Sequence, residues 1–157
     1  FSATTPQQPG LLTVNPSALL FNQINTSVAP VGVNMSSLRV PDGKSLLLVG
    51  GDILVNGGGI FAIEGNIHLA SLAAPGDVGL NIAGDNFNLT IPDNIERANL
   101  FLNNNAEVNV RGSNNGNTKI DARDISLTQG SKIKAGIETG TPLSQSGNIT
   151  INATGTI

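Results

Sequence analysis

Leu100-Phe-Leu-Asn-Asn-Asn-Ala-Glu-Val-Asn-Val110 and Ile125-Ser-Leu-Thr-Gln-Gly-Ser-Lys-Ile-Lys-Ala135 are two versions of one pattern. In both stretches an aliphatic residue occupies the first, third, ninth and eleventh places, and the second stretch begins 25 residues after the first. A constant period of this length is typical of a stacked-repeat protein. Apolar and polar residues alternate within each stretch, as in strands with one buried face. A third version of the pattern is expected 24 residues further on, at Ile149, Ile151 and Ile157.

Upstream of this pair, apolar doublets recur about every seven residues and are separated by glycine-rich turns. Three such steps give a coil of about 21 residues, the size of a three-sided turn of stacked strands. Glycine suits the corners, because a corner often requires a positive φ. The sequence therefore predicts an all-β protein, a right-handed parallel β-helix with three-sided coils of about 21–25 residues. The doublets are Leu46/Leu48, Ile53/Val55, Ile60/Ala62 and Ile67/Leu69.

The 25-residue offset also predicts which outward side chains stack between neighbouring coils. Glu107 should lie directly above or below Lys132, and Asn109 above or below Lys134. A stacked pair of opposite charges contributes only about 0.2–1 kcal/mol. This pairing is therefore a test of register more than a source of stability.

The domain organisation expected from the sequence is a single β-helical segment over residues 1–157. Residues 1–10 read as a lead-in, residues 11–45 as early coils or extra strands, and residues 46–157 as coils. Within the last range, Pro75-Gly76 and Pro92-Asp93 interrupt the pattern, so we expect an irregular insertion around residues 73–99 that protrudes from the stack.

Composition excludes several functions. The net charge of −3 and pI of about 4.9 argue against nucleic acid as a partner, since phosphate binding needs clustered positive charge. There is no cysteine and only one histidine, His68, which is expected to point outward from a strand, so no metal site or cofactor is predicted. No run approaches the roughly 18 apolar residues of a membrane helix, so no membrane insertion is expected.

Four stretches resemble cyanobacterial filamentous-haemagglutinin-like exoproteins, namely residues 11–23, 40–53, 67–76 and 147–155. The resemblance implies a large secreted passenger of a two-partner secretion system, exported by an outer-membrane transporter and folded as a β-helix at the bacterial cell surface. It implies adhesion, with a host or cell-surface glycan or protein as a further partner. The secretion-directing motif of that family, Asn-Pro-Asn-Gly-Ile, is matched only loosely at Asn15-Pro16-Ser17. We therefore expect the chain to begin inside or just after the secretion domain.

Asp121 and Asp124 are the candidate carboxylates for chemistry, because they lie in the densest charged run of the chain. Some β-helices are polysaccharide lyases or hydrolases, which use paired acids or a bound cation. The competing interpretation is a solvated turn between coils, and we favour it. The predicted function is accordingly a non-enzymatic shaft or adhesin scaffold. Its alternatives are a carbohydrate-active β-helix enzyme and a recognition module that the transporter reads.

Two further features are candidates for binding. Phe101 lies between inward residues, so it should point outward, where it would either stack on a sugar or pack under residues 73–99. The amides of Asn103, Asn104 and Asn105 would hydrogen bond to a glycan, or these residues would serve as turn formers. The structural alternative is favoured in both cases.

Overall fold

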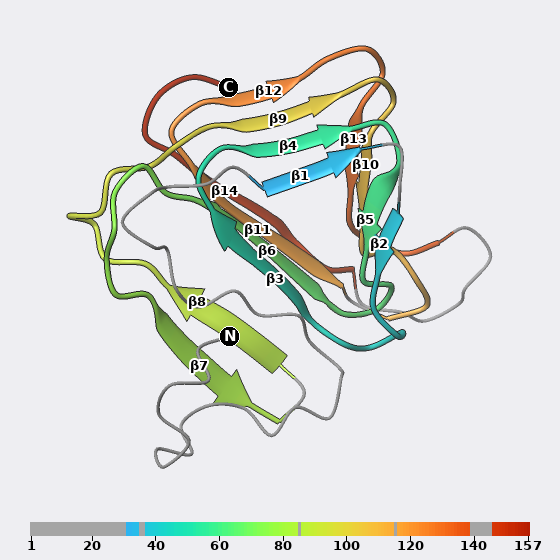
Figure 1. The fold of residues 1–157 in the computed structure, drawn as a ribbon. Helices are drawn as coiled ribbons and strands as arrows, with labels where there is room; N and C mark the ends of the chain where they lie inside the picture. The colour runs from blue at the N-terminus through green and yellow to red at the C-terminus, as the bar shows by residue number, and fades with distance from the viewer. Residues whose placement is uncertain (1–30, 35–36, 85, 115, 139–145) are drawn as a thin grey trace.

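Three-stranded coils stack on one another in the computed structural model of this protein, which describes residues 31–34, 37–84, 86–114, 116–138 and 146–157 (Figure 1). Within these residues there are four coils. The strands of coil 1 are β1 (Val31–Asn34), β2 (Ser37–Arg39) and β3 (Leu46–Gly50), and those of coil 2 are β4 (Ile53–Asn56), β5 (Gly59–Phe61) and β6 (Asn66–Ser71). Coil 3 has β9 (Leu100–Asn103), β10 (Glu107–Asn109) and β11 (Asn117–Ala122), and coil 4 has β12 (Ile125–Leu127), β13 (Lys132–Lys134) and β14 (Ile149–Ala153).

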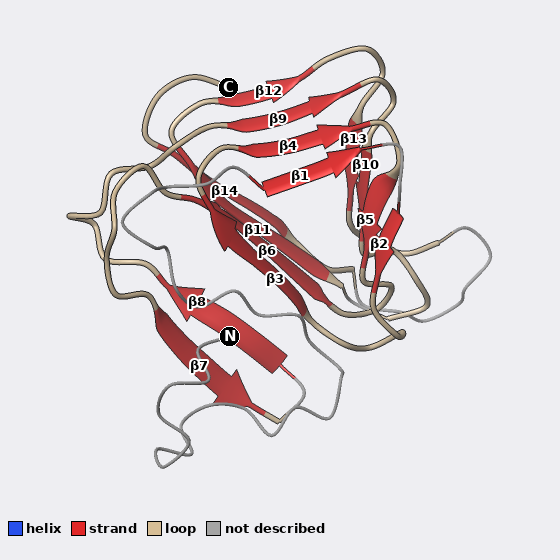
Figure 2. Ribbon diagram, in the orientation of Figure 1, coloured by secondary structure: helices blue, strands red, loops and turns tan. Residues whose placement is uncertain are grey.

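Each side of the coil contributes its strands to one parallel sheet. Sheet A has the order β1-β4-β9-β12, sheet B the order β2-β5-β10-β13, and sheet C the order β3-β6-β11-β14. The prediction of an all-β protein built as a parallel β-helix is thus confirmed. Only strands and loops occur in the described residues (Figure 2), so none of them forms a helix able to cross a membrane. Residues 1–30 lie outside the described residues. The lead-in expected at residues 1–10 and the part of the early coils expected at residues 11–30 are therefore not described by the structure.

The register of the stack agrees with the sequence as far as β13 and departs from it only at β14. Ile125 pairs with Leu100 as predicted, and Leu46 pairs with Ile67. The prediction that Ile149 stacks on Ile125 is wrong, because Ile149 pairs with Thr118 in sheet C. The backbone N–H of Ile125 instead donates to the Thr156 oxygen, 2.9 Å away. The connection between β13 and β14 is longer than the earlier corners, and corner length leaves no trace in the apolar alternation.

Glu107 lies opposite Lys132 and Asn109 opposite Lys134, so the predicted register of sheet B is confirmed. The ion pair is diagonal rather than direct: the Glu107 carboxylate accepts from Lys134 Nζ at 2.5 Å and from Asn109 Nδ2 at 2.7 Å. The Lys132 side chain is exposed to solvent. A long side chain can reach a diagonal neighbour as well as the residue directly opposite. The sequence therefore predicts which residues lie opposite each other, but not which of them form the ion pair.

The same register predicts a crosslink. Cysteines at positions 107 and 132 should form a disulfide under mild oxidation, because directly opposite residues of neighbouring strands satisfy the geometry of that bond. Cysteines at positions 107 and 126 should not, because Ser126 lies on β12 in sheet A. The chain has no cysteine of its own, so the shift of the oxidised band on a non-reducing gel reports only the introduced pair. Equal crosslinking of both pairs would contradict the register.

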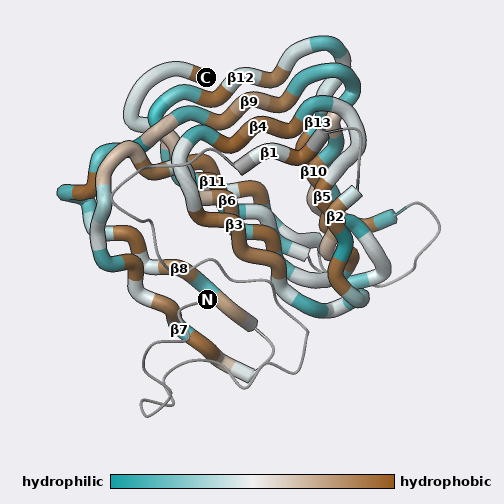
Figure 3. The backbone as a smooth tube through the Cα atoms, viewed as in Figure 1, coloured by the Kyte–Doolittle hydropathy of each residue, from teal (hydrophilic) through white to brown (hydrophobic). Residues whose placement is uncertain are grey.

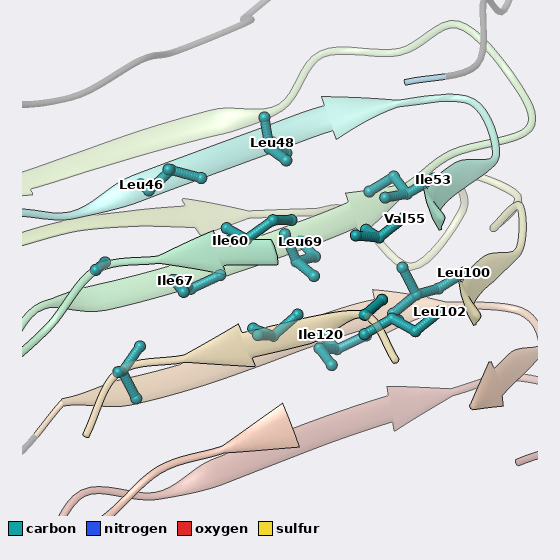
Figure 4. Packing of buried hydrophobic residues seen from close by; sticks show 14 of the residues in the cluster. Leu46, Leu48, Ile53, Val55, Ile60, Ile67, Leu69, Leu100, Leu102 and Ile120 are labelled. Carbon is teal, nitrogen blue, oxygen red and sulfur yellow. The ribbon is translucent and has the colours of Figure 1, made fainter. Parts of the chain in front are cut away.

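The interior of the stack is a column of aliphatic side chains (Figure 4). All of the predicted doublets from Leu46 to Leu69 are inward and 0–1% exposed. Rows of like residues form where strands stack in register, as with Leu46 on Ile67 and Val55 on Leu102. Only 3% of the residues are aromatic, so branched aliphatic side chains fill this narrow interior instead of aromatic ones.

One corner of the stack is built from glycine. Gly65, Gly116 and Gly147 follow one another where the chain enters sheet C, and each packs against the backbone of the preceding coil. A β-carbon on Gly65 would lie 2.0 Å from the Lys44 oxygen, and one on Gly147 would lie 1.8 Å from the Gly116 oxygen. The coils can approach this closely only because these residues carry no side chain.

The insertion between β6 and β9 contains an antiparallel hairpin, β7 (Gly79–Ala83) and β8 (Asn86–Thr90). The hairpin lies outside the stack of coils, and β8 packs on the outer face of sheet C against β3 and β6 (Figures 1 and 3). An antiparallel bridge between Leu72 and Arg97 closes the neck of the insertion. The apolar cluster under the hairpin contains Leu47, Val49, Ala70, Leu72, Leu89 and Ile95, with Val78, Leu80, Phe87 and Ile91 packed around it.

Candidate functional site

The outer face of sheet C changes from apolar to polar along the stack. The register places its outward residues in pairs, strand by strand: Leu47 and Val49 on β3, His68 and Ala70 on β6, Lys119 and Asp121 on β11, and Thr150 and Asn152 on β14. The hairpin covers the apolar end of this face, on β3 and β6. At the polar end, Thr150 and Asn152 on β14 are exposed, whereas Lys119 on β11 is half-buried and Asp121 is buried.

A buried histidine and a buried aspartate meet where the covered and open parts join. His68 Nε2 lies 2.6 Å from Asp121 Oδ2, and the two residues are 2% and 5% exposed. The backbone N–H of Leu89, on β8, donates to His68 Nδ1 at 3.3 Å. Because Nδ1 accepts this bond, the ring proton must sit on Nε2 and point at Asp121. This arrangement is that of a neutral imidazole with both nitrogens engaged.

Asp121 connects the histidine to the rest of the stack. Its Oδ1 accepts from Asn152 Nδ2 at 2.9 Å, and Lys119 Nζ lies 3.8 Å from its Oδ2. Burial acts to raise the pKa of this carboxyl, but the hydrogen bonds from His68 and Asn152, with the nearby positive charge, hold the pKa below its ordinary 3.8. A chain of hydrogen bonds therefore runs from β8 through β6 and β11 to β14.

The lowered pKa of Asp121 predicts how the stability of the domain depends on pH. A carboxyl whose pKa is lower in the folded state stabilises the fold above its unfolded pKa, and this contribution is lost as pH falls through the folded pKa. Asp121→Asn should thus cost about 1–3 kcal/mol at neutral pH, because Asn152 Nδ2 or His68 Nε2 would lose its acceptor. The difference from the wild type should shrink as the pH falls below 3.8 and through the lower pKa of the folded state. Urea unfolding at neutral and at acidic pH measures it, and a constant difference would contradict the assignment.

Two hollows border β8 where it passes over the polar end of sheet C. One has a volume of about 400 Å³ and the other about 650 Å³, and both are lined by Asn88 and Lys119. Four asparagines are among the residues that line the first hollow, and two of them are linked, since Asn117 Nδ2 donates to Asn66 Oδ1 at 3.0 Å. No group of three or more His, Asp or Glu side chains suited to a metal ion occurs among the described residues.

Phe101 lies on β9 in sheet A, with Leu54 and Ser126 on either side of it. Its side chain is outward, as the alternation indicates, and half-buried. The hairpin packs on sheet C, so the described residues do not place Phe101 under the insertion. A sugar-stacking role for this ring stays a prediction.

The three predicted asparagines occupy the corner between β9 and β10. Asn103 ends β9, and Asn104 and Asn105 have φ values of 55° and 58°. Asparagine tolerates this left-handed conformation better than most residues, so the corner itself accounts for its use there. Recognition of a glycan by these amides remains a prediction.

Asp124 lies in the corner between β11 and β12, and its hydrogen-bond partners differ from those of Asp121. Its Oδ1 accepts from the Thr156 backbone N–H at 2.8 Å and from Thr156 Oγ1 at 3.0 Å, and Arg123 Nε donates to Oδ2 at 3.0 Å. These bonds, led by those from Thr156, lower the pKa of Asp124. The solvated-turn interpretation suits Asp124 and not Asp121, which belongs to β11 and is buried. The two carboxylates are held in separate hydrogen-bond networks.

Sequence reasoning did not find the contact between His68 and Asp121. The two residues are 53 positions apart, because the hairpin interrupts the period between their strands. One signal was available: Leu46-Leu-Leu-Val49 is apolar at every position, and a strand of that kind is covered on both faces. This run indicated that something packs on the outside of sheet C.

A family model described as the TPS secretion domain, where TPS stands for two-partner secretion, matches residues 1–123. The chain belongs to this family. The match ends between β11 and β12, so the TPS secretion domain takes in coils 1 to 3 and the hairpin, and coil 4 lies beyond it. Of the two positions expected from the sequence, inside the secretion domain or just after it, the match to residues 1–123 supports the first. Comparisons with curated proteins and with solved structures gave no match.

Proposed function

We propose that this chain is the region of a two-partner secretion exoprotein that the outer-membrane transporter recognises, so that the exoprotein is secreted across the outer membrane. The observation that carries the proposal is the match of the TPS secretion domain to residues 1–123. Recognition by the transporter, an alternative in the sequence analysis, is thus preferred to the shaft role for coils 1 to 3. Membership of a family of secretion domains also favours a non-enzymatic role over carbohydrate chemistry.

The coil stack is suited to a protein that folds after export. Each coil bonds only to the coils next to it, so a stack can grow one coil at a time from a first folded unit. The chain contains no cysteine, so this growth requires no oxidation step. We propose that coils 1 to 3 provide the first folded unit at the cell surface.

Coil 4 favours a second role, that of a shaft. It lies beyond the matched residues, yet β12 and β13 continue the 25-residue register of coil 3. A β-helix that extends past the secretion domain supports the proposal of a surface adhesin scaffold that carries a binding region away from the cell. A host or cell-surface glycan or protein would be its partner.

An export assay tests the first role. The chain, fused through its C-terminus to a β-lactamase that lacks its own route across the outer membrane, should appear in the culture medium only when the cognate transporter is co-produced. The physical reason is that recognition resides in residues 1–123, which the fusion retains. Enzyme activity in medium and periplasm gives the exported fraction.

The control fuses residues 124–157 alone to the same enzyme and should remain in the periplasm. Release of the two fusions in equal amounts, or release of the full fusion without the transporter, would contradict the proposal. Binding of the purified chain to a glycan array addresses the adhesin role separately.

A further inference from the structure

The hairpin is fixed to sheet C by an apolar cluster and by two hydrogen bonds from the edge of β8. The backbone N–H of Phe87 donates to Ser45 Oγ at 3.5 Å, and that of Leu89 donates to His68 Nδ1 at 3.3 Å. The second bond is buried, and it is the shorter of the two. An imidazole nitrogen can accept such a bond only while it carries no proton.

Histidine is the residue type whose side chain ordinarily gains a proton between pH 5 and pH 8, and His68 is the only histidine of the chain. The sequence has one histidine and no cysteine, and carboxyls and lysines ordinarily titrate outside this range.

The surroundings of His68 decide where a second proton would go. From β11, Asp121 occupies the Nε2 side at 2.6 Å, with Lys119 next to it. From β3, the residue opposite His68 is the apolar Leu47. The strand β8 presents the Leu89 N–H and carries no charged side chain. Because Nε2 already holds its proton against Asp121, a second proton can bind only at Nδ1.

Charged residues further from the His68 ring do not change where the second proton would bind. Arg97 and Asp93, in the segment after β8, line the second hollow together with Asp121. The Arg97 guanidinium is engaged with the backbone oxygens of Pro92 and Ile95. Asp121 remains the charge in direct contact with the ring, and the imidazolium would be paired with it.

We propose that the hairpin is an acid-sensitive latch: protonation of His68 at Nδ1 removes the acceptor of the Leu89 N–H and loosens β7–β8 from sheet C while the coil stack stays folded. The proton taken up places an N–H donor against the N–H of Leu89, and two donors in a buried contact repel each other. At the same time the ion pair with Asp121 stabilises the imidazolium. The ion pair with Asp121 favours proton uptake by the ring. The repulsion between the two N–H donors couples that uptake to the position of β8.

Loosening the hairpin would expose the apolar part of the outer face of sheet C. Leu47, Ala70 and Leu72 are each 0% exposed beneath it. The core of the β-helix lies on the other side of the sheet and contains no residue of the hairpin. Loosening the hairpin would therefore expose the outer apolar cluster and leave the inner one buried. This behaviour does not depend on the proposed role in secretion.

Amide hydrogen exchange followed by NMR tests the latch on the whole chain. The protection factor of the Leu89 amide should fall about tenfold or more from about pH 7.5 to about pH 5, whereas that of Leu102, in the core, should change little. The ¹⁵N shift of His68 Nδ1, which is unambiguous because the protein has one histidine, should follow the same midpoint. Fluorescence of 1-anilinonaphthalene-8-sulfonate should rise with the fall in protection.

His68→Gln supplies the matched variant, since a glutamine has no proton to gain in this range. Its Leu89 protection should be independent of pH. Three results would overturn the latch: His68 takes up a proton while Leu89 protection is constant, His68 stays neutral down to about pH 5, or the variant keeps the pH dependence. If the variant fails to fold, the wild-type comparison of the ¹⁵N shift with Leu89 protection still decides.

Discussion

Gly116→Ala should destabilise the domain by about 3 kcal/mol or more. A β-carbon at this position would lie 2.2 Å from the Val110 oxygen and 2.9 Å from the Gly65 oxygen. Both atoms belong to the backbone of the stack, so no side-chain rotation relieves the contact. The Val110 oxygen belongs to the same coil and the Gly65 oxygen to the preceding one, so the corner itself would have to open and the pairing of β11 with β6 would weaken.

Urea unfolding followed by circular dichroism measures the effect, with Gly84→Ala as the control. Gly84 has a φ of 62°, and a β-carbon added to it would meet no atom within 4 Å, so alanine there adds only backbone strain. That strain costs about 1 kcal/mol. Equal losses in the two variants would show that conformation, rather than the close approach of coils, explains the use of glycine at position 116.

Leu102→Ala should cost about 3 kcal/mol, within the range for a large-to-small change in a packed core. Leu102 is 0% exposed and stacks between Val55 on one side and Leu127 on the other. Removing its branched end leaves a cavity in the middle of the aliphatic column. The strands around the cavity are held in register on both sides and cannot collapse into it.

Leu127→Ala is the matched control, because Leu127 occupies the same place one coil later and is 40% exposed. Its loss should be below about 1 kcal/mol, since less apolar surface leaves water. The two midpoints of urea unfolding give the comparison directly. Similar losses at the two positions would mean that coil 4 is covered in solution by something that packs on its open end.

The inward residues of the coils could be predicted because each obeys a local rule. Val108 and Val110 are inward and buried for the same reason that Ile60 is: alternation with period two marks the face toward the core. Stacking in register then follows from a constant spacing, which is why the sequence correctly predicts Glu107 opposite Lys132.

Features that depend on distant parts of the chain could not be predicted in this way. The period assigns Ile149 to the wrong sheet, because the preceding corner is longer than the others and corners carry no periodic signal. The pairing of His68 with Asp121 depends on how the chain resumes its path after the hairpin. The sequence predicts that His68 points outward and that Asp121 belongs to a charged run, but it does not show what covers either residue.

The closed neck of the insertion has a practical consequence. Ala73 N–H donates to the Glu96 oxygen at 2.7 Å and Ala98 N–H to the Ser71 oxygen at 2.9 Å, so the chain leaves the stack and returns to it at the same point. Polypeptide placed between these bonds need not alter the coils on either side. This position is therefore a natural graft point, where a foreign epitope or enzyme could be displayed on the rod, provided that the graft also shields Leu47 and Val49.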